Sequence, residues 1–149
     1  MRLAFYQPDQ AGNVGTAIRL AACLGVPLDV IEPCGFPFSY RALKRAGMDY
    51  VEIAAVARHA SWEAFEATLS GRLVLFTTKA AAPLPEGRFE AGDTLLFGSE
   101  SAGAPEHVHA RADLRLRIPQ AGGTRSLNLA VAAGIGLAEA LRQTGAWPG

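Results

Sequence analysis

Short apolar runs alternate with helical patterns along the whole chain, and this alternation constrains the fold more than any other feature. Runs rich in Leu, Val, Ile and Phe are typical of buried strands. We expect strands at residues 3–6, 28–31, 51–53, 73–76, 94–97 and 114–118. Each parallel pair of strands needs a crossover, usually a helix. The sequence therefore predicts an α/β fold with a mainly parallel sheet covered by helices on both faces.

The segments between these runs have helical spacing and helix start signals. We expect helices at residues 13–24, 40–46, 62–69, 105–110 and 126–143. Asn13 and Ser61 stand at two of the expected starts, and both are side chains that commonly cap helices. Helical spacing and apolar surroundings predict core positions for Trp62, Phe65, Leu69 and Cys23.

Composition limits the kinds of protein that fit. A chain of 149 residues, 50% hydrophobic, predicts one domain over residues 1–149 that needs no disulfide or metal. A formal net charge of zero argues against a general coating of nucleic acid. No run reaches the ~18 apolar residues of a membrane span, and the start lacks a signal peptide, so we expect a cytoplasmic protein. His107 and His109 have no third ligand nearby, so we expect no metal site.

In open α/β sheets, ligands bind beyond the carboxyl ends of the strands. After the first strand, the chain offers Asn13 and Gly15 at a helix start and Arg19 two turns on. Free N–H groups at a helix start attract an anion. An ordinary capped helix with a surface arginine is the alternative at this place.

Two further strands are followed by similar segments. Gly98, Glu100 and Gly103 follow residues 94–97, where glycines permit tight turns beside a ligand. A simple turn before the next helix is the alternative there. The last strand leads into a flexible loop and then into Arg125, Ser126 and Asn128.

The last helix is apolar nearly all round between residues 129 and 138. Such a helix is expected to be buried on most sides. We expect part of that burial to come from a second subunit, with Gly134 and Gly136 permitting close approach. A plain core helix is the alternative.

Taken together, order, spacing and strand context make these segments specific. The chain closely resembles the SPOUT class of RNA 2′-O-ribose methyltransferases in three motifs: Asn13-x-Gly15-x-x-x-Arg19, Phe97-Gly98-x-Glu100-x-x-Gly103, and Ile118-Pro119 followed by Arg125-Ser126-Leu127-Asn128-Leu129. It is also similar to a small stand-alone member of the class at Ile31-Glu32-Pro33, Gly35-Phe36, residues 45–50, Arg58-His59 and Thr77-Thr78-Lys79.

The resemblance implies an α/β knot fold, in which a C-terminal trefoil knot forms an S-adenosylmethionine site. Carried onto matching positions, it implies that the cofactor is bound by Phe76, Thr77, Gly98, Ile118, Ser126 and Leu127. It also implies catalytic roles for Arg19, Asn13, Glu100 and Asn128. Class proposals make the arginine a base, whereas a guanidinium pKa above ~12 favours an electrostatic clamp.

For substrate, the resemblance implies the ribose 2′-hydroxyl of the wobble nucleotide, cytidine or modified uridine at position 34, in leucine tRNA. Candidate contacts with tRNA phosphates are Arg125, Arg45 and Arg58, for which solvated surface arginines are the alternative. The class forms homodimers in which both subunits build each active site. Another tRNA position, rRNA, or a non-catalytic RNA-binding module of the same fold are the other functions considered.

Overall fold

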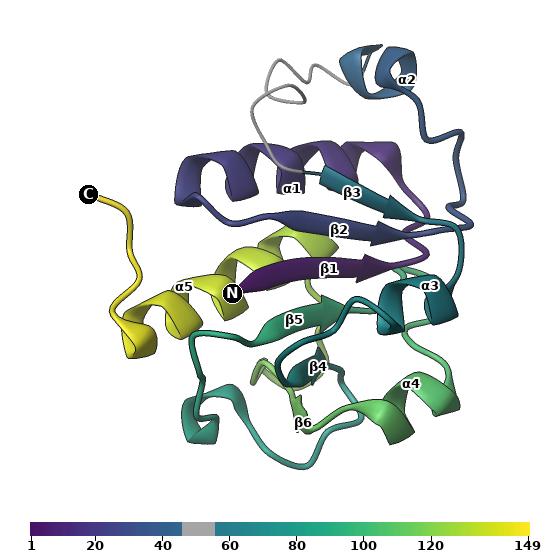
Figure 1. Ribbon diagram of the computed structural model, residues 1–149. Helices are drawn as coiled ribbons and strands as arrows, with labels where there is room; N and C mark the ends of the chain where they lie inside the picture. The colour runs from purple at the N-terminus through teal and green to yellow at the C-terminus, as the bar shows by residue number, and fades with distance from the viewer. Residues whose placement is uncertain (46–55) are drawn as a thin grey trace.

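All strand pairings of the sheet are parallel, as the alternating pattern predicts. The computed structural model describes residues 1–45 and 56–149 and has six strands in the order β3-β2-β1-β5-β4-β6 (Figure 1). Their bounds are β1 Arg2–Tyr6, β2 Leu28–Ile31, β3 Val56–His59, β4 Leu73–Phe76, β5 Thr94–Phe97 and β6 Leu114–Leu116. The carboxyl ends of neighbouring strands therefore meet at one edge of the sheet.

Helices cover both faces of this sheet (Figure 1). On one face, α1 (Ala11–Leu24) and α5 (Leu129–Thr144) pack with α2 (Tyr40–Arg45) into a core that includes Ile18, Leu43 and Leu137. On the other face, α3 (Trp62–Glu66) and α4 (Glu106–Arg111) contribute Trp62, Phe65 and Val108 to a second core. A short 3-10 helix lies at Leu84–Glu86. The prediction of a parallel sheet covered on both faces is confirmed.

The apolar runs located β2, β4 and β5 with the bounds that the structure has, whereas β1 begins one residue earlier than predicted, at Arg2. In β2, β4 and β5 every residue is buried, because neighbouring strands and both helical layers surround them. The expected strand at residues 51–53 lies outside the described residues, as do residues 46–50 of the resemblance. β3 at Val56–His59 has no counterpart among the expected strands.

Several helix boundaries differ from the predicted ones. Ser61 caps α3 as expected, accepting a hydrogen bond from the Ala64 N–H at 3.1 Å, but α3 ends at Glu66. α5 begins at Leu129, with Asn128 as its cap, three residues later than predicted. α4 begins at Glu106 and ends at Arg111, and β6 stops at Leu116.

Asn13 does not cap α1, so that prediction is wrong. The helix begins at Ala11, and its N-cap, Gln10, makes no side-chain capping bond. Asn13 instead lies inside the first turn with 8% of its surface exposed. Glu100, from a distant loop, serves the α1 N-terminus in place of a local cap.

Cys23 is exposed, so its predicted core position is wrong. The buried stripe of α1 passes through Val14, Ala17, Ile18 and Ala21. Cys23 follows Ala21 by two residues, about 200° around the helix, and so faces away from the core. Helical periodicity, more than local hydrophobicity, decides the burial of this side chain.

α5 is buried on one side only within this chain. Val131 and Ile135 are 51% and 38% exposed, one turn apart on the outer face of the helix. Gly136 faces the sheet, where an added Cβ would lie 2.8 Å from Phe76 Cζ. The expectation that Gly136 permits subunit contact is therefore wrong, because this glycine makes room for core side chains of the same chain.

None of the helices described here is long and apolar enough to cross a membrane.

Replacing Gly136 by alanine tests this packing. Phe76 cannot move easily, because it stacks on Phe97 at 4.5 Å and lies parallel to Phe89 at 6.3 Å. We expect Gly136→Ala to lower the free energy of unfolding by about 1–3 kcal/mol through overpacking. Urea denaturation of the variant and the wild type measures this change in the free energy of unfolding.

Gly134→Ala in the same helix is the matched control. Its added Cβ would meet only Leu20 Cδ2 at 3.9 Å. Alanine also favours helix more than glycine does, so this variant should be neutral or gain up to about 1 kcal/mol. Equal losses in the two variants would contradict the assignment.

Candidate functional site

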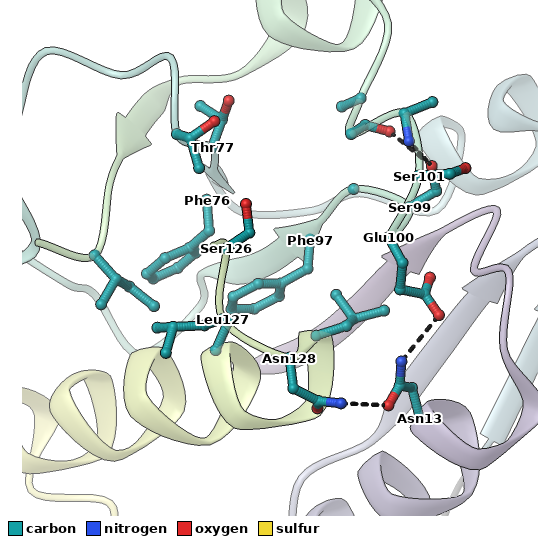
Figure 2. A pocket seen from close by; sticks show the side chains of 18 of the residues that line it. Asn13, Phe76, Thr77, Phe97, Ser99, Glu100, Ser101, Ser126, Leu127 and Asn128 are labelled. Carbon is teal, nitrogen blue, oxygen red and sulfur yellow. Dashed lines mark hydrogen bonds between the residues drawn. The ribbon is translucent and has the colours of Figure 1, made fainter. Parts of the chain in front are cut away.

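A cavity of about 680 Å³ opens at the carboxyl ends of β4 and β5 (Figure 2). Its lining comes from the segments that follow β1, β4, β5 and β6 and from the start of α5. These segments lie far apart in the sequence and meet here because the parallel strands end at a common edge. The cavity lies at the edge of the sheet where the sequence predicts a ligand site.

One wall of the cavity is apolar and flat. Phe76 and Phe97 end β4 and β5, and their rings stack with centroids 4.5 Å apart and planes 12° from parallel. Ile118 and Leu127 add aliphatic surface to the lining. Stacked aromatic rings with aliphatic neighbours suit a flat, ring-containing ligand.

Gly98 is required by the chain's own backbone. A Cβ at this position would lie 2.4 Å from the carbonyl carbon of Gly103. The loop closes on itself through paired Ser99 and Gly103, whose N–H groups donate to each other's carbonyls at 3.0 and 2.9 Å. Gly103 has φ of +65°, which favours glycine. The glycine pair thus shapes the tight turn that the sequence predicted, and the group that approaches Gly98 is this loop.

Glu100 is the centre of a hydrogen-bond network at the edge of the cavity. Its Oε1 accepts from the Asp9 N–H at 2.9 Å, and its Oε2 accepts from the Gln10 N–H at 3.0 Å. The amide nitrogen Nδ2 of Asn13 also donates to Oε2, at 3.0 Å. A carboxylate at this place satisfies N–H groups at the start of α1 and complements the positive end of the helix dipole.

The network continues through Asn13 to the start of α5 (Figure 2). Asn128 Nδ2 donates to Asn13 Oδ1 at 2.8 Å. Asn128 Oδ1 accepts from the N–H groups of Ala130 at 2.9 Å and Val131 at 3.2 Å, and so caps α5. Three predicted catalytic residues from three motifs therefore form one chain of hydrogen bonds.

A second bond holds the same two loops together. The Ser101 N–H donates to Asp9 Oδ2 at 2.9 Å, and hydrogen bonding by Ser101 holds the pKa of Asp9 below its usual value. The ionised carboxylate is the form that this contact favours. The loops after β1 and β5 are thus joined in both directions, by Glu100 toward Asp9 and by Asp9 toward Ser101.

Gln120 shapes the loop that precedes α5, and the motif analysis missed it. Its Nε2 donates to the Arg125 carbonyl at 2.9 Å, while its Oε1 accepts from the Leu127 N–H at 3.3 Å. A polar side chain directly after Ile118-Pro119 was the available sequence signal.

The structure brings most of the predicted site residues together. The cavity lining includes all six expected cofactor residues, together with Asn13, Glu100, Asn128 and Arg125. Arg19 lies outside the described lining, on the exposed face of α1. Asn13 is buried, so Asn13 and Arg19 differ in exposure although both lie on α1.

The two remaining arginines lie elsewhere. Arg45 is exposed at the end of α2. Arg58 ends with its Nη2 2.6 Å from Glu32 Oε1 and its guanidinium carbon 4.6 Å from the centre of the Phe38 ring. Its side chain remains 48% exposed. Arg58 is thus an anchored surface arginine.

Lys79 and His109 also line the cavity, although neither was predicted there. Lys79 is exposed, whereas His109 is 8% exposed. The ring centroids of His107 and Trp62 lie 5.9 Å apart. The two histidines of α4 therefore point in different directions. In residues 1–45 and 56–149, no three His, Cys, Asp or Glu side chains gather closely enough to hold a metal ion.

A parallel α/β sheet with a small-molecule cavity at its carboxyl edge defines a class of ligand-binding enzymes. Comparison with known proteins identifies the member of that class. The chain belongs to the SpoU rRNA Methylase family, whose model matches residues 1–138.

Similar proteins are aligned over nearly their whole length. A tRNA (cytidine(34)-2'-O)-methyltransferase of Beijerinckia indica is 54% identical over 147 residues, which are 97% of this chain and 92% of that protein. The protein of the same name from Escherichia coli K12 is 39% identical over 152 aligned positions, which cover 100% of this chain and 96% of its own.

Solved structures share the architecture. A structure from work on 2-OH methylation of C/U34 on tRNA has a TM-score of 0.89 and 47% identity, and the match covers 95% of this chain and 94% of that one. The SpoU methyltransferase AviRb from Streptomyces viridochromogenes, in complex with AdoMet, has a TM-score of 0.85 and 27% identity, covering 96% of this chain and 57% of that one.

Replacing Glu100 by glutamine tests the network. Glutamine has one acceptor oxygen for donors that now share two, and its NH2 group would face backbone N–H groups. We expect the free energy of unfolding to fall by about 1–3 kcal/mol. Amide exchange at Asp9 and Gln10 should also accelerate.

Glu86→Gln is the matched control, because Glu86 is exposed in the Leu84–Glu86 helix, away from the cavity lining. Its urea midpoint should stay at the wild-type value. Unchanged exchange at Asp9 and Gln10 in Glu100→Gln would show that the carboxylate does not hold the start of α1.

Proposed function

We propose that this chain is an S-adenosylmethionine-dependent methyltransferase that acts on the ribose 2′-hydroxyl of nucleotide 34, cytidine or modified uridine, in leucine tRNA. The observation that carries the proposal is the cavity that gathers all six expected cofactor residues beside the Glu100–Asn13–Asn128 chain. The 54% identical relative, named a tRNA (cytidine(34)-2'-O)-methyltransferase, supports nucleotide 34 of tRNA as the substrate.

The cavity fits S-adenosylmethionine. Its volume of about 680 Å³ lies within the usual range for small-molecule sites. The stacked Phe76 and Phe97 rings offer an apolar surface to a purine, and Thr77 and Ser126 offer polar groups. When bound, the cofactor supplies a methyl group that its positively charged sulfur has already activated.

The protein's residues then have to position the hydroxyl and help to remove its proton. Correct alignment alone supplies up to ~7–11 kcal/mol of the barrier. Both oxygens of Glu100 already accept hydrogen bonds from N–H groups, so Glu100 positions the loops and is a poor proton acceptor. Arg19 is best suited to stabilise the developing alkoxide and to hold phosphate, because a guanidinium stays charged.

A second copy of the chain gives Arg19 a place in the reaction. Arg19 is exposed on α1, outside the lining of its own cavity, while the outer face of α5 exposes Val131 and Ile135. α1 and α5 pack against each other, and Leu20 Cδ2 lies 3.9 Å from where a Cβ added to Gly134 would be. Pairing these faces across a two-fold axis buries the apolar side chains and brings each Arg19 toward the partner's α5. The active form is therefore a homodimer with shared sites.

Arg125 at the cavity, with Arg45 and Arg58 outside it, supplies positive charge for tRNA phosphates. The zero net charge of each chain leaves the basic surface to be assembled from two subunits. A cytoplasmic location and a single catalytic domain over residues 1–149 belong to the same proposal.

Methyl transfer to tRNA tests the function directly. Purified protein is incubated with tritiated S-adenosylmethionine and total tRNA from a strain that lacks the gene, and labelled nucleosides are mapped. We expect label at position 34 of leucine tRNA. Label at another tRNA position or in rRNA would favour those alternatives, and no label from folded protein would leave a non-catalytic RNA-binding module.

Arg19→Ala should lower turnover by at least ~10²-fold, as expected for a lost transition-state contact. The dimer should remain intact by ultracentrifugation. Arg88→Ala, which removes an exposed arginine outside the cavity lining, should keep wild-type turnover. Full activity of Arg19→Ala would exclude Arg19 from the reaction.

Mixed dimers test whether the site is shared. Leu127→Glu places a charge in the cavity lining, so Arg19→Ala and Leu127→Glu should each be inactive alone. Co-expressed, they should recover roughly a quarter of wild-type activity, because a random mixture contains heterodimers with one intact site. Absence of recovery in purified heterodimers would show that each chain builds its site alone.

A further inference from the structure

Among the side chains that line the cavity, His109 is buried and has a polar group that the proposed reaction does not use. It is 8% exposed. Asn13, the other buried polar side chain of the lining, is bonded to Glu100 and Asn128. The His109 backbone N–H donates to the Pro105 carbonyl at 3.2 Å, but no hydrogen bond or ion pair joins the His109 ring to any described residue.

The ring nitrogens of His109 nevertheless keep access to solvent. Every fully buried side-chain nitrogen and oxygen of the described residues has a hydrogen-bond partner. A ring without a protein partner must therefore present its nitrogens to accessible space, and His109 is one of the residues that line the cavity. A buried imidazole beside a cavity, with no hydrogen-bond partner in the protein, is available to form a hydrogen bond with a ligand.

The charged and polar residues that line the cavity differ in how exposed they are. Lys79 and Arg125 are exposed and suit the anionic parts of a ligand or of RNA. His109 shares its low exposure with Phe76 and Phe97, the aromatic wall. The flat and least polar part of a ligand is the part that gains most from such surroundings.

We propose that His109 recognises the nucleoside part of the cofactor, by a hydrogen bond between its imidazole and a ring nitrogen, amine or ribose hydroxyl. The inference rests on the proposed function and deepens it. An imidazole can both donate and accept, so it suits a nucleoside, which carries both kinds of group. A ligand without the amino-acid part should keep this contact.

Binding to two ligands tests the inference by calorimetry on the full-length protein. S-adenosylhomocysteine carries nucleoside and amino acid, while 5′-methylthioadenosine carries the nucleoside without the amino acid. His109→Leu retains apolar volume but loses the hydrogen bond, so we expect the Kd of both ligands to rise roughly three- to tenfold. His109→Asn, which still hydrogen-bonds, should recover part of the loss.

His107→Leu is the matched control, because His107 lies two residues away and contacts Trp62. It should bind both ligands with wild-type Kd. In NMR spectra, the chain's three histidines give few ring signals, and the His109 signal should shift on addition of 5′-methylthioadenosine while the His107 signal stays.

The outcomes are distinct. An unchanged Kd for both ligands in folded His109→Leu, or an unshifted His109 signal, would overturn the inference and leave the proposed function standing. Weakened binding of S-adenosylhomocysteine alone would overturn the nucleoside assignment, since His109 would then serve the amino-acid part. Failure of the wild-type protein to bind either ligand would overturn the proposed function, and this inference with it.

Discussion

The site depends on the hydrogen bonds that the side chain of Glu100 accepts. α1 begins without a side-chain cap of its own, and Glu100 reaches its first N–H groups from a loop about ninety residues away. Removing those N–H groups from water without a partner would be costly. The same carboxylate orders Asn13, and Asn13 in turn holds Asn128 at the start of α5. One side chain thus fixes three segments that the sheet only brings near one another.

The aromatic wall of the cavity is made of side chains that also belong to the core. Phe76 and Phe97 end two buried strands, stack on each other, and leave room for α5 only because residue 136 is glycine. Close packing therefore transmits any change in α5 directly to the cavity wall. In this chain, the core and the candidate ligand site therefore share residues.

Sequence reasoning succeeded where the determining interactions are local or periodic. Continuous apolar runs gave β2, β4 and β5 with their observed bounds, because strands buried on both faces need apolar residues at every position. It failed where a distant group decides. Asn13 was predicted to cap α1, and no local pattern reveals that Glu100 takes that role. The direction of Gly136 and the burial of His109 likewise depend on neighbours from other elements.

The resemblance predicted six cofactor residues that do line one cavity, because they stand at strand ends and before α5, where the fold repeats the backbone placement. Arg19 is different, since its proposed role depends on a position relative to another molecule. Six positions after the buried Asn13, it lies about 120° around α1, on an exposed side of the helix. Arg19 is outside the described lining of the cavity that Asn13 edges in its own chain. In the proposed dimer, a two-fold partner would place Arg19 beside a cavity without distorting α1, and it would cover Val131 and Ile135 by the same contact.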